Sequence, residues 1–254
     1  MFSELPRFSL LYKDIQQYSR KSSFFNSFAN RIDSCAATFK FYKVLDNGLS
    51  WVPENQWEIL VKKIHKVINR KHEIREFHEV LYEALGFWYL RTIQNVDQVK
   101  YIPEKQTRTP DFKACTQDIT IFCEQKTKNT SDEDNKRYMD DLEKNKPQIV
   151  PDRSTPTLDS AKKLLNTIIS NATEQLTGFE LETQNKLSIK KILFIVLLVD
   201  TVYDSYFRPL IEPFQQALDT IYKGFDVEVL IYHHQVGWNL IRNDGSCLVC
   251  SFHA

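Results

Sequence analysis

An almost continuous apolar segment, from Lys191 to Asp200, is the feature that most limits what this chain can fold into. Its centre, Ile192 to Val199, holds eight apolar residues in a row, which is far too few to span a bilayer. A strand with both faces covered has this composition, whereas a strand with one wet face alternates apolar and polar residues. The segment therefore predicts a buried strand in an α/β sheet and no membrane association.

The chain after residue 70 alternates helical and extended patterns. Helical spacing of apolar residues predicts helices over 73–91 and 157–177, and Gly178 is the expected C-cap of the second. A further helix is predicted over 205–223. Strands are predicted over 96–102, 110–115, 118–126, 191–200, 227–233, 237–241 and 247–252. This order predicts an α/β sandwich in which a central mixed sheet has helices on both faces.

Two regions and one insertion are expected. Residues 1–69 are rich in aromatic side chains and irregularly amphipathic, which favours a helical N-terminal region packed on the core. Residues 70–254 would form the α/β domain. Within it, residues 127–155 are dense in charges and prolines and poor in apolar residues, which predicts a polar surface insertion. The sequence leaves open whether this insertion is a lid over the site or a disordered segment.

Charge and cysteine usage narrow the expected setting of the protein. Lys+Arg and Asp+Glu number 33 each, so the net charge does not distinguish between partners and only local clusters can. The five cysteines are odd in number and lack the spacing of a disulfide framework, which favours a reducing cytosol. The early Glu4 and Pro6 do not resemble a signal peptide. We therefore expect a cytoplasmic protein.

The stretch from Thr109 to Lys126 carries the candidate chemistry. Side chains alternate along a strand, so Glu124 and Lys126 share one face of the strand predicted there. Asp111 begins the preceding strand and reaches the same place if the two strands pair as a hairpin. Two carboxylates with an ammonium beside them suit a hard divalent cation.

The helix over 73–91 offers a further acid. Its apolar stripe consists of Phe77, Val80, Leu81, Ala84 and Trp88. Glu73 lies at the edge of that stripe, whereas Glu76, Glu79 and Glu83 lie on its flank. An inward carboxylate is costly unless it is paired or bound to metal, so Glu73 is the first candidate and Glu76 the second, with Glu79 left open. The alternative is that all four are surface acids that balance nearby bases.

A basic run precedes this helix, in and after a helix predicted to begin after Ser50. Between Lys62 and Arg75 the chain holds a single acid, Glu73. Clustered Lys and Arg displace counterions from a nucleic-acid backbone, so the run favours phosphate contact; the alternative is a solvated helix face. The candidate nucleic-acid-binding residues are Lys62, Lys63, Lys66, Arg70, Lys71 and Arg75.

Together these features resemble the restriction-endonuclease-like PD-(D/E)XK nuclease superfamily. An acid-bearing helix is followed by Pro110-Asp111, then by Glu124-Gln125-Lys126, then by a helix and a buried strand, and the motif reads T-P-D-F-x11-E-Q-K. The similar order covers residues 70–200, which is about half of the chain. The resemblance implies a core in which a central mixed sheet is flanked by helices.

The resemblance also implies roles for individual residues. Asp111 and Glu124 would bind Mg²⁺ or Mn²⁺, and the backbone carbonyl of Gln125 would complete the protein ligands. Lys126 would orient or activate the attacking water. Glu73, or with less support Glu76, would complete or support the metal shell.

The helix after the motif adds one more residue by the same route. The segment Asn171 to Leu176 is similar to an A-x-x-Q-L pattern of some family members, in which the glutamine faces the site. Asn171 stands where those members often have a lysine, so we carry over Gln175 only.

The sequence thus predicts a metal-dependent endonuclease or exonuclease acting on DNA, in restriction, defence, repair or mobile-element processing. A homodimer is suggested by analogy, because many such enzymes cut both strands of a duplex as dimers. Three alternatives remain: a nuclease-fold protein that binds nucleic acid without cutting it, an RNA-cleaving relative, and an interaction protein whose acids are surface residues.

Overall fold

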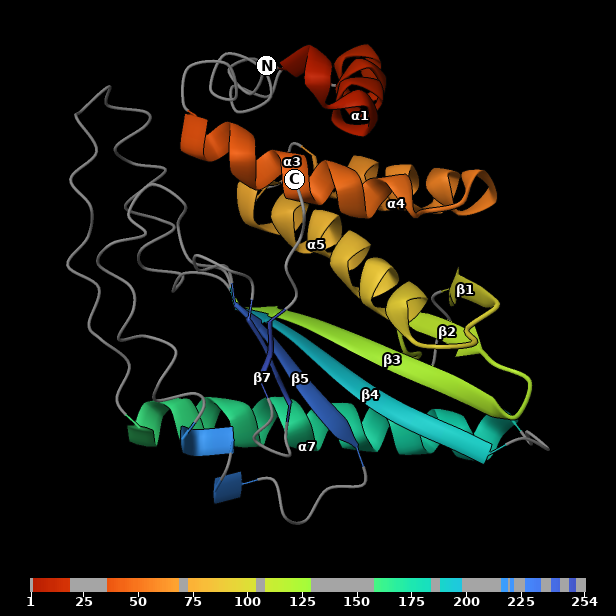
Figure 1. Ribbon diagram of the computed structural model, residues 1–254, viewed down its shortest axis with the longest axis vertical. Coiled ribbons are helices and arrows are strands. Elements are labelled where there is room, and N and C mark those ends of the chain that lie inside the picture. The colour runs from red at the N-terminus through yellow and green to blue at the C-terminus, as the bar shows by residue number, and fades with distance from the viewer. Residues whose placement is uncertain are drawn as a thin grey trace.

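The computed structural model describes residues 2–18, 36–68, 73–103, 108–128, 158–183, 188–197, 216–218, 220–221, 227–233, 239–242 and 247–249. Its architecture is α/β, with a mixed sheet between helices (Figure 1). The helices are η1 (Phe2–Glu4), α1 (Pro6–Tyr18), α3 (Ala36–Ser50), α4 (Glu54–Val67), α5 (Glu73–Thr92) and α7 (Leu158–Thr183). The strands are β1 (Gln98–Tyr101), β2 (Phe112–Cys115), β3 (Ile119–Lys128), β4 (Ser188–Leu197), β5 (Glu228–His233), β6 (Asn239–Arg242) and β7 (Cys247–Val249).

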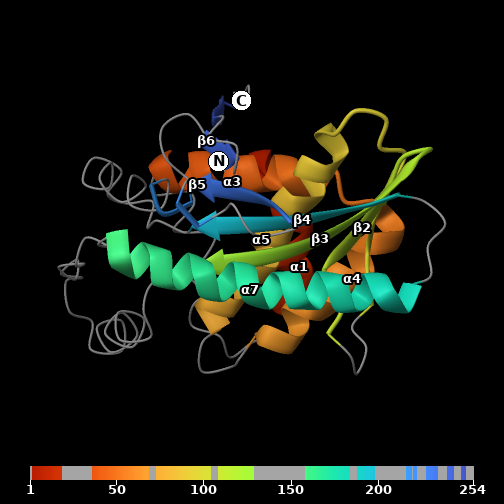
Figure 2. The same cartoon turned by 90° about the horizontal axis from the view of Figure 1, so that it is seen from below.

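The strands lie in the sheet in the order in which they occur along the chain. The central pairs β3–β4 and β4–β5 are parallel, and the four outer pairs are antiparallel. A parallel pair needs a crossover connection, and α7 lies between β3 and β4 in the chain. Figures 1 and 2 show α5 across one face of the sheet and α7 along the other. The expectation of a mixed sheet with helices on both faces is confirmed.

The alternation of side chains along β3 separates two apolar clusters. Ile121 and Cys123 belong to the cluster formed with α5, whereas Phe122 belongs to the cluster formed with α7. Phe122 meets Phe179 of α7 edge to face at 5.0 Å between ring centroids. The predicted alternation is therefore confirmed. It also determines whether each polar side chain further along β3 faces α5 or α7.

The N-terminal helices pack on the outer side of α5, away from the sheet (Figure 1). Residues of α1, α3 and α4 share one apolar cluster with α5 and the first three strands. Two buried side-chain contacts add specificity: Asp46 Oδ1 accepts a 2.7 Å hydrogen bond from the Phe8 backbone N–H, and Gln56 Oε1 accepts one of 2.9 Å from the Tyr101 N–H. The second contact covers part of the edge of β1 with α4.

Several predicted boundaries hold and two do not. The buried strand is confirmed as β4, although residues 198–200 lie outside the described part of the chain. The expected C-cap at Gly178 is wrong, since α7 continues to Thr183. It continues because Phe179 still buries its ring on the sheet and Glu180 pairs with Lys191 at 3.1 Å.

The polar insertion does not begin at residue 127 as predicted. Thr127 and Lys128 are the last residues of β3 and pair with Val196 and Leu197 of β4. The remainder of the predicted insertion, 129–155, lies outside the described residues. Of the helix predicted over 205–223, the structure describes 216–218 and 220–221, which are helical. No helix in the described ranges is both long and apolar enough to cross a membrane.

Candidate functional site

The register of β2 and β3 brings Asp111 to the middle of β3. Phe112, the first residue of β2, pairs with Cys123, so Asp111 lies one step further on, opposite Glu124. Its carboxylate Oδ2 accepts a 2.8 Å hydrogen bond from the backbone N–H of Gln125. Because the N–H and C=O of one strand residue point to the same edge, the Gln125 carbonyl lies at the edge that faces Asp111.

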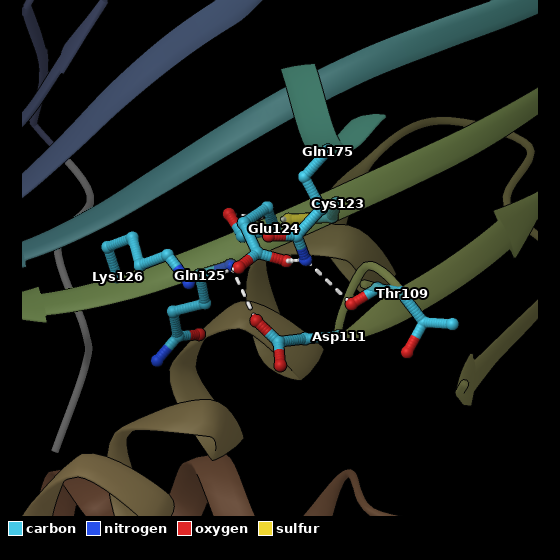
Figure 3. Close-up of polar contacts among 7 residues, drawn as sticks. All are labelled: Thr109, Asp111, Cys123, Glu124, Gln125, Lys126 and Gln175. Atoms are coloured by element: carbon cyan, nitrogen blue, oxygen red, sulfur yellow. Dashed lines mark hydrogen bonds and ion pairs between the residues drawn. The ribbon is translucent and has the colours of Figure 1, made fainter. Parts of the chain in front are cut away.

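Glu124 is held from two sides by side chains. Gln175 of α7 donates from Nε2 to Glu124 Oε2 at 2.7 Å, and Lys126 Nζ forms an ion pair with Oε1 (Figure 3). Gln175 Nε2 also lies 2.7 Å from the Thr109 carbonyl oxygen, which ties α7 to the segment before Asp111. The Glu124 side chain is 2% exposed and that of Lys126 is 41% exposed. The ion pair therefore links a buried carboxylate to a lysine side chain that solvent reaches.

Burial and a neighbouring carboxylate both disfavour the charged form of Glu124. The pKa of Glu124 is raised to about 7: burial raises it most, the neighbouring carboxylate of Asp111 also raises it, and the Lys126 ammonium partly offsets the rise. Removing a carboxylate from water disfavours its charged form, and so does a second negative charge nearby. The site therefore favours added positive charge next to Glu124.

The donor atoms available here fit a hard divalent cation. Asp111 and Glu124 supply carboxylate oxygens, and Gln125 supplies a peptide carbonyl at the same strand edge. Among the described residues no three His, Cys, Asp or Glu side chains gather into a cluster that could hold a metal. Mg²⁺ is commonly bound through one or two carboxylates, with waters and substrate phosphates completing the shell, so this donor set suits it.

The Gln125 side chain extends to the opposite face from Glu124, toward α5. Gly86 of α5 lies directly against it: a Cβ atom added to Gly86 would come within 2.3 Å of Gln125 Oε1 and 2.9 Å of Phe112 Cε2. A glycine at this point allows α5 to approach β3 closely. Sequence reasoning missed this pair, because nothing local marks a glycine inside a helical pattern as a contact point for a strand.

The helix acid is only partly placed. Glu73 begins α5, but its side chain is outside the described part of the structure. Glu79 precedes Gly86 by seven residues, about two helical turns, so it lies on the side of α5 that faces β3. Glu76 and Glu79 are both half-buried. Glu83 pairs instead with Lys63 of α4 at 2.8 Å.

The predicted basic surface divides into different environments. Lys62 and Lys66 are exposed on α4, and Lys62 lies 3.7 Å from Glu58. Lys63 was predicted to contact phosphate, but its ammonium pairs with Glu83 and lies 5.0 Å from the centre of the Tyr101 ring. With 14% of its side chain exposed, Lys63 has a structural position, which corrects that prediction.

The other three basic candidates cannot be assessed in the same way. Arg70 and Lys71 lie outside the described residues, and so does the side chain of Arg75. The structure thus brings Asp111, Glu124, Gln125, Lys126 and Gln175 together and leaves the nucleic-acid surface open. Thr109, whose carbonyl accepts from Gln175, was not predicted.

Comparison with known proteins adds no family assignment. No protein-family model, no curated protein and no solved structure matches the chain significantly.

Proposed function

We propose that this protein is a metal-dependent nuclease that hydrolyses phosphodiester bonds in DNA, with a core of the PD-(D/E)XK type. One observation carries the proposal: Asp111, Glu124, Lys126 and Gln175, which are spread over 65 positions of sequence, meet in one hydrogen-bonded group. Two acids, an amine and an amide in this arrangement suit the activation of water beside a phosphate.

Asp111, Glu124 and the Gln125 carbonyl would hold Mg²⁺ or Mn²⁺. When bound, the cation supplies charge stabilisation at the phosphate oxygens and lowers the pKa of a water molecule. Gln175 keeps the Glu124 carboxylate fixed by its 2.7 Å hydrogen bond. The Gln125 N–H does the same for Asp111. The helix acid would be the predicted Glu73, or with less support Glu76.

Lys126 would act on the substrate side of the pair. Its side chain is the more exposed partner of the ion pair with Glu124. An ammonium on a flexible stem can move from the carboxylate to a phosphate oxygen or to the attacking water when substrate arrives. Its positive charge would then stabilise the negative charge that develops on the phosphate in the transition state.

DNA is the proposed substrate, and contacts to the phosphate backbone would come from exposed bases such as Lys62 and Lys66 rather than from Lys63. An RNA substrate and a homodimeric enzyme are compatible with the same group of side chains. A cellular role in restriction, defence, repair or mobile-element processing follows from the resemblance and is part of the proposal.

The test is a cleavage assay with the full chain. Supercoiled plasmid, linear duplex and RNA are each incubated with Mg²⁺, Mn²⁺ or EDTA. Asp111→Asn and Lys126→Met are compared with Asp118→Asn and Lys100→Met, which change exposed residues away from the site. The proposal expects metal-dependent DNA cleavage that is lost in the first two variants and kept in the two controls.

Other outcomes would favour the alternatives. A gel shift without cleavage would favour a binding protein, and cleavage restricted to RNA would favour an RNA-processing enzyme. If neither binding nor cleavage occurs, the acids are structural and the proposal is wrong.

A further inference from the structure

The side-chain amide of Gln125 is buried without a hydrogen-bond partner among the described residues. The residue is 7% exposed, and both Nε2 and Oε1 are unsatisfied. Each buried polar group left in this state lowers the stability of the fold. Methionine has a similar volume and would fill the same space without that cost. Packing alone therefore does not explain why an amide stands at this position.

The helix opposite is also shaped around this amide. Gly86, inside α5, leaves the space that Gln125 Oε1 occupies, since any Cβ there would lie 2.3 Å from that oxygen. Glycine in a helix interior is less favourable than alanine. Two locally unfavourable choices, a buried amide without a partner and a glycine inside a helix, thus meet at Gln125. The backbone N–H of Gln125 also holds the Asp111 carboxylate. Breaches of local consistency of this kind concentrate at functional sites.

The amide and the Asp111 carboxylate both adjoin the backbone of Gln125, because the carboxylate lies on the Gln125 N–H at the edge of β3. The Gln125 side chain extends from the same residue toward α5, and in Figure 3 its amide oxygen is on the side nearer to Asp111. An amide oxygen and a carboxylate are both hydrogen-bond acceptors, so neither can satisfy the other. A water molecule has two protons to donate and can bridge two such acceptors at little cost.

We propose that Gln125 is a positioning residue for Asp111. Its amide oxygen holds the Asp111 carboxylate, through one water molecule, in the orientation that a divalent cation requires. This inference rests on the proposed metal site. It adds Gln125 as a residue that orients Asp111, one of the proposed metal ligands. Groups that orient metal ligands from behind typically change metal affinity or activity by about 10–100-fold when they are removed.

The experiment compares Gln125→Met with wild type in the full chain. Mn²⁺ binding is measured by calorimetry, and thermal unfolding is measured in EDTA. We expect Mn²⁺ affinity to fall about 10–100-fold, while the melting temperature in EDTA stays the same or rises because an unsatisfied amide is gone.

Gln56→Met is the matched control. Gln56 is also a buried glutamine, but its Oε1 accepts the Tyr101 N–H at 2.9 Å. This variant should lose stability and keep its Mn²⁺ affinity, which is the opposite pattern.

Each remaining outcome decides the matter. Unchanged Mn²⁺ affinity in Gln125→Met overturns the inference and leaves the nuclease proposal intact. A wild-type protein that binds no Mn²⁺ overturns both. If Gln125→Met does not fold, Gln125→Leu replaces it; failure of both to fold would show that the amide serves stability, and would also overturn the inference.

Discussion

Gln175 on α7 donates a 2.7 Å hydrogen bond to Glu124 Oε2 on β3, across 51 positions of sequence. The same nitrogen lies 2.7 Å from the Thr109 carbonyl, two residues before Asp111. One amide therefore joins the helix on one face of the sheet to both acidic segments of the site. This relationship sets the first prediction.

Replacing Gln175 with leucine should reduce both metal affinity and cleavage. Glu124 would lose the donor that fixes its orientation, and loss of such an outer support costs about 10–100-fold. The measurements are Mn²⁺ calorimetry and the initial rate of plasmid cleavage. The control is Glu174→Gln, which changes the exposed neighbour on the same helix. Equal effects of the two substitutions would contradict a specific role for Gln175.

Replacing Lys126 with methionine should separate binding from chemistry. The ammonium pairs with Glu124 and so competes with a cation for that carboxylate. We expect Mn²⁺ affinity to be kept or to rise, whereas the cleavage rate falls about 10²–10⁴-fold, as for loss of a group that assists proton transfer. Lys100→Met serves as the control in both assays. Parallel losses of Mn²⁺ affinity and rate would argue against this assignment.

The raised pKa of Glu124 predicts a specific pH dependence of stability. Its pKa is about 7 in the folded protein against an ordinary 4.5, so the folded state binds the proton more tightly than the unfolded state. The free energy of unfolding should therefore fall as pH rises between those two values, by about 3 kcal/mol at most. Urea unfolding without metal at pH 5, 6, 7 and 8 measures it. Glu124→Gln should remove this part of the slope; an unchanged slope would place the titration elsewhere.

Two glycines in helices should respond in opposite directions to alanine. At Gly86 a Cβ would lie 2.3 Å from Gln125 Oε1 and 2.9 Å from a Phe112 ring carbon, whereas at Gly178 nothing lies within 4 Å. We expect Gly86→Ala to destabilise the fold by about 1–3 kcal/mol through overpacking. Gly178→Ala should stabilise it by up to about 1 kcal/mol through helix propensity. Chemical denaturation measures both, and stabilisation by Gly86→Ala would disprove the close approach of α5 and β3.

Neighbouring lysines on α4 should also differ. Lys63→Met leaves Glu83 without its 2.8 Å ion pair, with 14% of each side chain exposed, and should cost about 1–3 kcal/mol. Lys62→Met changes a solvated side chain and should leave stability unchanged.

The same substitution tests whether α4 contacts DNA. If it does, Lys62→Met should lower the slope of log binding constant against log salt concentration by about one. A fluorescence titration at several salt concentrations reads this out.

Much of this arrangement could be predicted from local pattern. The apolar segment that became β4 and the alternation along β3 each follow from side chains within one element. The convergence of Asp111 and Glu124 needed one further assumption, a hairpin, which the register of β2 and β3 supports. Gln175 was identified through the family resemblance, because a polar residue on a helix does not by itself reveal which strand it faces.

The errors share a physical cause, which is tertiary contact. Lys63 reads as part of a solvated basic run, since its partner Glu83 lies twenty residues away on another helix. Gly178 reads as a helix stop, but Phe179 continues to bury its ring on Phe122 and carries the helix past it. Gly86 carries no local signal, and only the packing of α5 on β3 reveals what it does.

Direct Mn²⁺ binding tests the central claim that Asp111 and Glu124 share a divalent cation. Calorimetry on the full chain at pH 8, where Glu124 is ionised, should show a site that is lost in Asp111→Asn and in Glu124→Gln and kept in Asp118→Asn. No Mn²⁺ binding by the wild-type protein, or binding that is equal in all three variants, would contradict the account.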